Sequence, residues 1–390
     1  MRRGIPGSIV ILGGGFGGIV SANRLRDLLG DESRITLIDR KSSFFLGLSK
    51  LWVMTGQREP GDQARNLGLL ERKGIKVIQT EITKIDASAR NVATKAGSFG
   101  FDYLVIALGA ETAPGAVPGF VDGAHDLYDE SLKDVVRLRD TLKKFDGGKL
   151  LITVFGLPFK CPPAPYEAAF LIDELLRKKG VRDKTDFQFY TPEPFPLPAG
   201  GPNAGASIKS LLAERNISYN PGLKPKLVDP RDKSLAFENG TIVHYDLLVG
   251  VPLHTVPKVV KESGLAGPSG WIPVDNRTLR TSYSNVFAIG DVAGVTTANN
   301  LLIPRSGILA EEEAKVVANN IATSILGRGT TQRFEGKGVC FMEVGGGKAA
   351  LVKGDFLFEP SPKIEVSQPS SEGLQAKKEF ESTRIGTWFS

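Results

Sequence analysis

The segment Ser8–Asp39, SIVILGGGFGGIVSANRLRDLLGDESRITLID, carries the pattern of a strand, a helix and a second strand. An apolar run over Ile9–Leu12 leads directly into a glycine-rich turn, and a helical run follows to about Leu29. A second apolar run, Ile35–Ile38, then ends at Asp39. This order, with a Gly-x-Gly-x-x-Gly turn between strand and helix, is typical of the βαβ units that bind dinucleotides.

The three glycines of the turn meet different steric needs. Gly13 permits the tight turn, Gly15 lets the backbone approach a pyrophosphate, and Gly18 lets the helix pack closely on the strand. The first turn of the helix also presents unpaired N–H groups and the positive end of its dipole to phosphates. Asp39 stands at the end of the second strand, where it is placed to accept hydrogen bonds from a ribose. The segment therefore predicts a dinucleotide site.

The composition is that of a globular protein with more than one domain. The chain has 390 residues, of which 41% are hydrophobic and 24% are charged, enough for two or three domains. Its net charge of +6 suits an anionic cofactor, an anionic membrane surface or a small anionic substrate. The basic residues are scattered rather than arranged in a stripe, so we expect no nucleic-acid partner.

The numbers and spacing of the cysteines and histidines exclude further classes of protein. Two cysteines argue against a disulfide-stapled secreted scaffold, and with the three histidines they show no metal-ligand spacing. No apolar run reaches the roughly 18 residues that span a bilayer, and no segment reads as a cleavable export signal. We therefore expect a cytoplasmic protein without a metal, compatible with peripheral attachment to the inner face of the cell membrane and with a homo-oligomeric state.

A second strand–helix–strand pattern is inserted into the first. The run FDYLVIALGA is continuously apolar, as a parallel strand covered on both faces requires, and strand and helix patterns then alternate from Leu150 to Val251. The chain returns to the first domain at Asn285–Asp291. We predict an α/β fold with two Rossmann-like dinucleotide-binding domains and a small C-terminal α+β region. The predicted boundaries are 1–113 and 266–330 for the first domain, 114–265 for the second, and 331–390 for the C-terminal region.

The C-terminal region contains two predicted strands, 338–344 and 348–353, joined by three glycines. A Pro/Ser-rich connection, 359–372, leads to a basic and aromatic segment, Gln375–Phe389, whose first half at least is predicted to be helical. Two interpretations of this last segment stay open. It is either a helix that packs at the domain interface or an anchor that lies on a membrane surface.

Three motifs together resemble the two-dinucleotide-domain flavoproteins related to glutathione reductase. They are the N-terminal glycine fingerprint, the strand FDYLVIALGA, and the motif TSYSNVFAIGDVA that begins at Thr281. The resemblance implies FAD in the first domain, with Asp291 facing its ribityl and phosphate end. The helix after Pro304 would aim its N-terminus at the N1–C2=O edge of the flavin, where it stabilises negative charge. The implied cofactor-binding residues are Gly13, Gly15, Phe16, Gly17, Gly18, Asp39, Arg40, Ala107, Gly109, Gly290, Asp291 and Pro304.

The second domain departs from relatives that take electrons from NADH. Its first strand ends in VFGLPFKCPPAPYE, residues 154–167, where a second Gly-x-Gly-x-x-Gly would be needed. One glycine is present and four prolines follow the strand. Proline has no N–H to donate and blocks close backbone approach, so this loop is poorly suited to a pyrophosphate. We do not expect NADH to be the reductant.

The KCPPAPYE segment closely resembles sulfide:quinone oxidoreductases and the flavoprotein subunit of flavocytochrome c sulfide dehydrogenase. In both, a cysteine at the position of Cys161 pairs with a late cysteine across the flavin, and Cys340 stands where that partner is expected. The resemblance implies that sulfide attacks a disulfide or polysulfide bridge between the two cysteines by thiol–disulfide exchange, and that Cys340 is the thiolate beside the flavin. Lys160 would favour an anionic sulfur on Cys161. Glu167 is either a general base or simply the first-turn carboxylate of its helix.

The residues that would contact the electron acceptor are marked less specifically in the sequence. Phe341, Phe380 and Trp388 are candidates for a slot that stacks a quinone ring, although each is also an ordinary core aromatic. Three departures from the resembled families stand out. There is no third cysteine in 109–129 and no histidine in TPEPFPLPAGG. Ser42 and Ser43 occupy the region where flavocytochrome attaches its flavin through a cysteine, so we expect FAD to be bound non-covalently.

Four functions remain open at this level. The resemblance favours FAD-dependent sulfide oxidation with electrons passed to a quinone. One alternative passes them to a cytochrome c, against which the absence of an export signal counts. A second is a type II NADH:quinone dehydrogenase, and a third is a flavin-binding redox sensor with little turnover.

Overall fold

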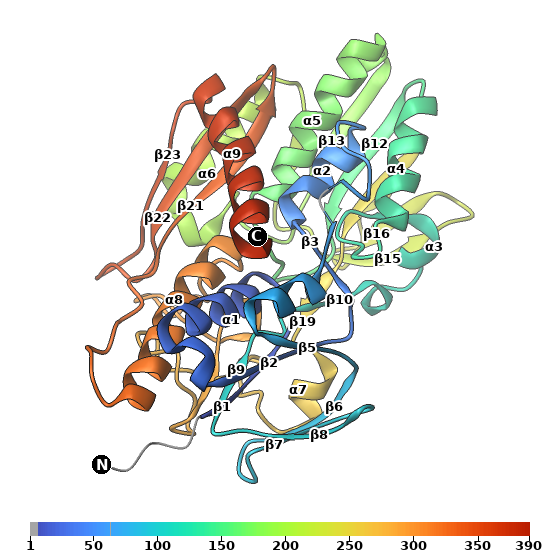
Figure 1. The fold of residues 1–390 in the computed structure, drawn as a ribbon. Coiled ribbons are helices and arrows are strands. Elements are labelled where there is room, and N and C mark those ends of the chain that lie inside the picture. The colour runs from blue at the N-terminus through green and yellow to red at the C-terminus, as the bar shows by residue number, and fades with distance from the viewer. Residues whose placement is uncertain (1–6, 63) are drawn as a thin grey trace.

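The computed structural model describes residues 7–62 and 64–390, so the first six residues of the predicted first domain lie outside the described part. Figure 1 shows two α/β layers, one from the N-terminal part of the chain and one from its middle. A C-terminal sheet and helix α9, at the red end of the colour range, complete the molecule. The predicted fold class, two Rossmann-like sheets with a small C-terminal region, is confirmed.

The first sheet is parallel and buried. Its strands run in the order β20-β9-β1-β2-β5. They are β20 (Val286–Ala288), β9 (Tyr103–Ile106), β1 (Ser8–Leu12), β2 (Arg34–Asp39) and β5 (Lys76–Gln79). Helices α1 (Phe16–Leu29) and α8 (Gly307–Leu326) pack against each other. Because β20 comes from the late return of the chain, this sheet joins segments from both sides of the inserted domain, as predicted.

The second sheet is also parallel, in the order β11-β18-β12-β13-β14. Its strands are β11 (His125–Asp126), β18 (Leu247–Val251), β12 (Gly148–Val154), β13 (Thr185–Tyr190) and β14 (Ser218–Asn220). The longer helices of this part are α4 (Lys133–Lys144), α5 (Ala164–Lys179) and α6 (Gly201–Ala213). Helix α5 begins directly after the Cys161 loop, so the loop occupies the end of β12 where a nucleotide turn would otherwise lie.

Antiparallel elements decorate both sheets. Two meanders are formed by β6 (Ile82–Asp86), β7 (Asn91–Thr94) and β8 (Gly97–Gly100), and by β15 (Pro225–Asp229), β16 (Ser234–Phe237) and β17 (Ile242–His244). The two connections between the sheets pair with each other as β10 (Glu111–Ala113) and β19 (Leu253–Thr255). Shorter elements are β3 (Ser43–Phe45), α2 (Lys50–Met54), β4 (Ala64–Asn66), α3 (Phe120–Gly123) and α7 (Lys258–Glu262).

The C-terminal region forms a three-stranded sheet of β21 (Lys337–Gly345), β22 (Lys348–Asp355) and β23 (Lys363–Val366), covered by α9 (Ser371–Phe389). The Pro/Ser-rich stretch 359–372 was expected to be a plain connection, and this expectation was wrong at β23. Its four residues, KIEV, alternate polar and apolar side chains, but they stand within a Pro/Ser-rich stretch, and they pair with β22 at the sheet edge.

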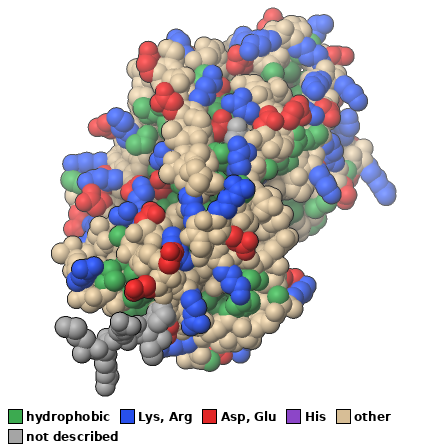
Figure 2. All heavy atoms as spheres, viewed as in Figure 1, with side chains coloured by type: hydrophobic (Ala, Val, Ile, Leu, Met, Phe, Trp, Pro, Cys, Tyr) green, Lys and Arg blue, Asp and Glu red, His purple; other side chains and the backbone are tan. Residues whose placement is uncertain are grey.

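Helix α9 turns its aromatic side chains inward. Phe380, Trp388 and Phe389 are each less than a tenth exposed, and Trp388 contacts Phe16 and Phe44 edge to face at ring distances of 5.2 and 5.7 Å. These three aromatic side chains of α9 therefore serve packing, as the first of the two interpretations expects. Within residues 7–62 and 64–390, no helix has both the length and the apolarity needed to cross a membrane. Lys and Arg side chains are interspersed with Asp and Glu over the face seen in Figure 2.

Candidate active site

A cavity of about 880 Å³ lies where the first sheet, the Cys161 loop and the C-terminal region meet. Its wall contains both cysteines, and it extends along the glycine turn after β1. Ten of the predicted cofactor residues line it: Gly13, Gly15, Phe16, Gly17, Asp39, Arg40, Ala107, Gly109, Gly290 and Asp291. Gly18 and Pro304 are not part of its lining.

The glycines of the turn are explained by what surrounds them. Gly13 has a φ of 102°, and a Cβ there would collide with the carbonyl oxygen of Ala107. A Cβ at Gly18 would collide with the carbonyl oxygen of Gly13, so Gly18 serves packing rather than contact with a ligand. At Gly15 a Cβ would meet no atom within 4 Å, because this position faces the open cavity. The turn thus closes on itself and leaves its ligand side free.

The buried guanidinium of Arg305 points to a bound polar group. It lies in the cavity wall, is 5% exposed, and stacks its guanidinium 3.6 Å from the centroid of the Trp271 ring. Its buried Nε and Nη2 have no hydrogen-bond partner among the described residues. Burial lowers the pKa of Arg305 to about 10, an effect that Asp291 and Glu313 oppose. A cofactor with oxygen acceptors would satisfy these donors, so the residues present fit FAD.

Cys161 and Cys340 are free thiols that open into the same cavity. Cys161 has a left-handed backbone, with φ of 51°, and its N–H donates to the carbonyl oxygen of Arg305 at 2.7 Å. Cys340 is on β21, and its Sγ lies 3.5 Å from the hydroxyl of Ser306. Burial raises the pKa of both thiols, and the charge of Cys340 raises that of Cys161 further. The fold therefore brings the two predicted redox residues into one chamber.

A buried ion-pair network stands beside the cysteines. Lys377 on α9 donates to Glu167 on α5 and, at 3.1 Å, to Glu343 on β21. Trp52 Nε1 donates to the same oxygen of Glu343 at 2.8 Å, and the Lys377 ammonium is 4.6 Å from the centroid of the Trp52 ring. Lys377 is 1% exposed, and each carboxylate is 4% exposed. Glu167 was identified from its sequence motif, whereas Lys377, Glu343 and Trp52 were not identified from the sequence.

The charges of this network act on its own members and on the cysteine. Burial raises the pKa of Glu167, and Lys377 opposes this shift. Burial lowers the pKa of Lys377, but the two carboxylates outweigh it, so the net shift is upward and the ammonium stays charged. Lys377 also lowers the pKa of Cys161 against the larger effect of burial. The structure thus provides a cation, a base with an elevated pKa and a thiol in one place.

Lys160, which precedes Cys161 and lines the same cavity, is engaged in an ion pair. Its ammonium pairs with Glu130 at 3.1 Å, and Glu130 also accepts from Lys41 at 2.5 Å. These two cations outweigh the effect of burial and lower the pKa of Glu130 to about 2. The expectation that Lys160 stabilises the Cys161 sulfur stays a prediction, and the cation that lowers the pKa of that thiol is Lys377. Lys160 ties the Cys161 loop to Glu130 of the same domain, and Glu130 in turn pairs with Lys41 of the first domain.

The loop after β12 cannot hold a pyrophosphate in the usual way. A Cβ at Gly156 would collide with the side chain of Leu253, so this glycine makes room for β19 and not for a phosphate. In the first turn of α5, the N–H of Ala164 already donates to the carbonyl oxygen of Cys161 at 2.9 Å. Pro165 has no N–H at all. The helix N-terminus is therefore largely closed as an anion site.

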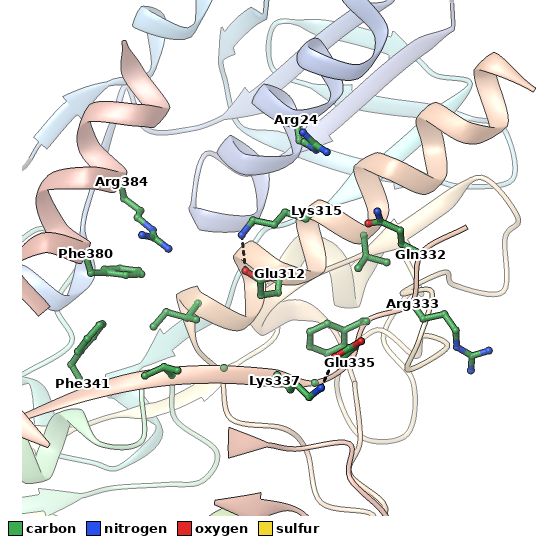
Figure 3. Close-up of a pocket in the computed structure, with 16 residues that line it drawn as sticks. Arg24, Glu312, Lys315, Gln332, Arg333, Glu335, Lys337, Phe341, Phe380 and Arg384 are labelled. Carbon is green, nitrogen blue, oxygen red and sulfur yellow. Dashed lines mark hydrogen bonds and ion pairs between the residues drawn. The ribbon is translucent and has the colours of Figure 1, made fainter. Parts of the chain in front are cut away.

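A second cavity of about 1110 Å³ lies between α8, the segment 332–339 and α9. Figure 3 shows Phe341 and Phe380 together at one end, with ring centroids 5.6 Å apart. Both rings and Ile308 also line the first cavity, so these residues stand between the two spaces. Trp388 lines neither cavity. Of the three aromatic quinone candidates, only Phe341 and Phe380 are thus in a position to contact a ligand.

Among the described ranges, no three His, Cys, Asp or Glu side chains are grouped closely enough to hold a metal ion.

A family model described as pyridine nucleotide-disulphide oxidoreductase matches residues 7–154 and 191–314. The chain belongs to the pyridine nucleotide-disulphide oxidoreductase family. The unmatched stretch 155–190 contains the Cys161 loop and α5, where this member of the family departs from the common pattern. The chain is a flavoprotein oxidoreductase, and FAD is the cofactor that the family implies.

Several relatives within this family are similar over most of the chain. The mitochondrial sulfide:quinone oxidoreductase of Mus musculus is 26% identical over 377 residues, covering 92% of this chain and 80% of that protein. The sulfide-quinone reductase of Aquifex aeolicus is 29% identical over 331 residues, covering 81% and 76%. The X-ray structure of the sulfide:quinone oxidoreductase from A. aeolicus matches with a TM-score of 0.88 at 25% identity, covering 98% and 91%. A type II NADH:quinone oxidoreductase of Staphylococcus aureus is 24% identical over 348 residues, covering 84% of each chain.

Proposed function

We propose that this flavoprotein oxidises sulfide and passes the electrons to a quinone. The observation that carries the proposal is the meeting of Cys161 and Cys340 in one cavity, beside the buried pair of Glu167 and Lys377. The loop that places Cys161 there also closes the position at which a pyridine nucleotide would bind. The similarity to sulfide:quinone oxidoreductases over most of the chain supports the same assignment.

The cysteine chemistry follows from thiol–disulfide exchange. With the two cysteines oxidised to a disulfide, hydrosulfide attacks Cys161 Sγ and the bond to Cys340 breaks. The new S–S bond leaves the substrate sulfur on Cys161 as a persulfide, and Cys340 departs as a thiolate with the electron pair. Glu167 accepts the proton of the entering hydrosulfide, because burial raises the pKa of its carboxyl group and so makes the carboxylate a stronger base. Lys377 stabilises negative charge on the sulfur of Cys161.

The first cavity would hold FAD non-covalently. The glycine turn, Asp39 and Arg305 would bind its polar parts, and Asp291 would face the ribityl chain. Bound FAD accepts two electrons and passes them to an acceptor. Ser42 and Ser43 offer no thiol for a covalent link. Acid precipitation tests this directly, since non-covalent flavin appears in the supernatant and covalent flavin stays with the pellet.

The second cavity is the proposed entrance for the quinone. Phe341 and Phe380 would stack its ring at the boundary between the two cavities. Arg24, Arg333 and Arg384 stand among the residues around the same space (Figure 3). Cationic groups at this opening would favour attachment to the anionic cytoplasmic surface of the membrane. Such attachment would bring the opening close to quinones dissolved in the bilayer. A homo-oligomer remains compatible with this arrangement.

The deciding experiment is anaerobic stopped-flow mixing of the purified yellow protein with sulfide and, separately, with NADH. Bleaching by sulfide that is lost in Cys340→Ser supports the proposal. Bleaching by NADH that ignores the substitution contradicts it and favours the type II NADH:quinone dehydrogenase. Reoxidation of the bleached protein by a short-chain quinone or by cytochrome c then separates the two acceptors. Slow bleaching without turnover would indicate a redox sensor.

A further inference from the structure

Ser306 occupies the N-cap of α8, a helix of 20 residues, and its side chain does not cap that helix. A serine at this position usually accepts a hydrogen bond from a backbone N–H of the first turn. The Ser306 hydroxyl instead lies 3.5 Å from the Sγ of Cys340. Ser370 provides the internal comparison, because it caps α9 in the ordinary way and accepts from the N–H of Gly373 at 3.0 Å.

The backbone beside Ser306 is tied to the other cysteine. The carbonyl oxygen of Arg305 accepts the N–H of Cys161 at 2.7 Å. Two consecutive residues before α8 therefore contact both cysteines, although these come from different parts of the fold. Ser306 is 8% exposed, so its hydroxyl has little access to water as an alternative partner. Buried polar groups are normally hydrogen-bonded, so the contact suggests that this hydroxyl influences the protonation state of the Cys340 sulfur.

The other groups around Cys340 do not provide this role. Glu167 on α5 repels a charge on Cys340, and burial disfavours it, while the contact with Ser306 lowers the pKa of the thiol. Lys377 on α9 is engaged by Glu167 and Glu343. Lys377 contributes to the pKa of Cys161 and is not among the causes of the Cys340 shift. Of the groups named here, the Ser306 hydroxyl is therefore the one that can donate a hydrogen bond to a thiolate at Cys340.

We propose that Ser306 is a catalytic residue whose hydroxyl donates a hydrogen bond to the Cys340 thiolate. A thiolate carries no proton, so the hydroxyl must be the donor in that state. The hydrogen bond stabilises the anionic sulfur in a buried chamber and fixes its position relative to Cys161. The inference rests on the proposed function, since it takes Cys340 as the sulfur that departs with the electron pair.

The test uses the flavin-loaded protein with Cys161→Ser, in which Cys340 is the only thiol of the chain. Iodoacetamide alkylation is followed by mass spectrometry between pH 6 and 10 with Ser306, Ser306→Ala and Ser306→Thr. We expect Ser306→Ala to move the profile to higher pH and to slow alkylation about fivefold at pH 8. Ser306→Thr keeps a hydroxyl and should restore the rate to within about twofold of the parent.

Ser370→Ala is the matched control, because it also removes an N-cap serine from a long helix. It should leave the alkylation profile unchanged. Equal profiles for Ser306→Ala and the parent, with flavin content and circular dichroism preserved, overturn the proposal. So does a Ser306→Thr profile as displaced as that of Ser306→Ala. The alkylation needs no turnover, and sulfide bleaching is measured separately in the protein that retains Cys161. An unchanged alkylation profile with sulfide bleaching intact in that protein refutes only the role of Ser306. A displaced profile without sulfide bleaching of that protein refutes only the proposed function.

Discussion

Lys377 and Glu167 are separated by 210 positions in the chain, and their side chains form an ion pair that is almost completely shielded from solvent. A second carboxylate, Glu343, completes the pairing of the ammonium at 3.1 Å. Buried charges are tolerated only when they are paired and hydrogen-bonded, which this network achieves through three elements that meet at the cavity. The pair links α9 to the helix that follows the Cys161 loop.

Replacing Lys377 by methionine should destabilise the fold and slow the reaction. The substitution leaves two buried carboxylates without their cation, which typically costs about 3–5 kcal/mol when one partner of a buried pair is removed. Urea unfolding measures the loss. Lys378→Met changes an exposed lysine on the same helix and should stay within about 0.5 kcal/mol of the wild type. Similar losses for the two variants would contradict the structural role of the pair.

Glu167→Gln tests the proposed base. The amide keeps the size of the side chain but cannot accept a proton, so sulfide-driven bleaching of the flavin should slow by about 100-fold. Glu174→Gln alters a carboxylate on the same helix that pairs with Lys178, away from the cysteines, and should bleach at the wild-type rate. Stopped-flow absorbance gives both rates. A Glu167→Gln protein that bleaches normally would reduce Glu167 to a structural partner of Lys377.

Phe341→Ala should affect the acceptor half of the reaction alone. Loss of a stacking ring at the boundary of the two cavities is expected to raise the KM for a short-chain quinone by about tenfold. Bleaching by sulfide should be unchanged, because Phe341 is not part of the cysteine chemistry. Phe358→Ala removes a ring that contacts Lys363 instead and serves as the control. An unchanged quinone KM in Phe341→Ala would place the quinone elsewhere.

Gly18→Ala should abolish flavin retention. The added Cβ would collide with the backbone oxygen of Gly13, which no side-chain movement can relieve, so the turn that faces the cofactor must distort. Gly115→Ala adds a methyl group where no atom lies within 4 Å and should keep its flavin. The ratio of flavin to protein absorbance after gel filtration reports the difference. Retention of full flavin by Gly18→Ala would show that the turn tolerates a side chain.

Glu193 predicts a pH dependence of stability. It is 4% exposed, and burial raises its pKa from 4.5 to about 7, against opposing hydrogen bonds from Tyr166 and Thr191. The folded protein therefore holds this proton more tightly than the unfolded chain, so its contribution is full below pH 4.5 and is lost as the pH rises through about 7.

Between pH 5 and pH 8, the wild type should lose about 2 kcal/mol more stability than Glu193→Gln, which cannot titrate. Urea unfolding at the two pH values provides the comparison. Glu214→Gln, at an exposed position on the same domain, should follow the wild type. Parallel losses in wild type and Glu193→Gln would mean that Glu193 is ionised in the folded protein across this range.

The sequence alone was sufficient for the fold class because the deciding signals are local. The glycine turn, the apolar strand before it and Asp39 lie within one βαβ unit, and each glycine answers a clash with nearby backbone or an open ligand side. Helix α4 was missed although Val135, Leu138 and Leu142 give it a readable apolar stripe. Cys161 was found because the KCPPAPYE segment marks it, and Cys340 because it stands where the resemblance places the partner cysteine.

The tertiary structure decided which charges and hydroxyls surround those cysteines. Lys377 stands in a basic segment where a lysine is normally solvated, and only the packing of α9 against β21 and β22 buries it beside Glu167. Lys160 is next to Cys161 in sequence, yet its flexible side chain reaches Glu130. Ser306 looks like a routine helix cap until β21 brings Cys340 to its hydroxyl. Local patterns specify backbone conformation, whereas the electrostatic surroundings of a buried sulfur depend on residues that meet only after the chain has folded.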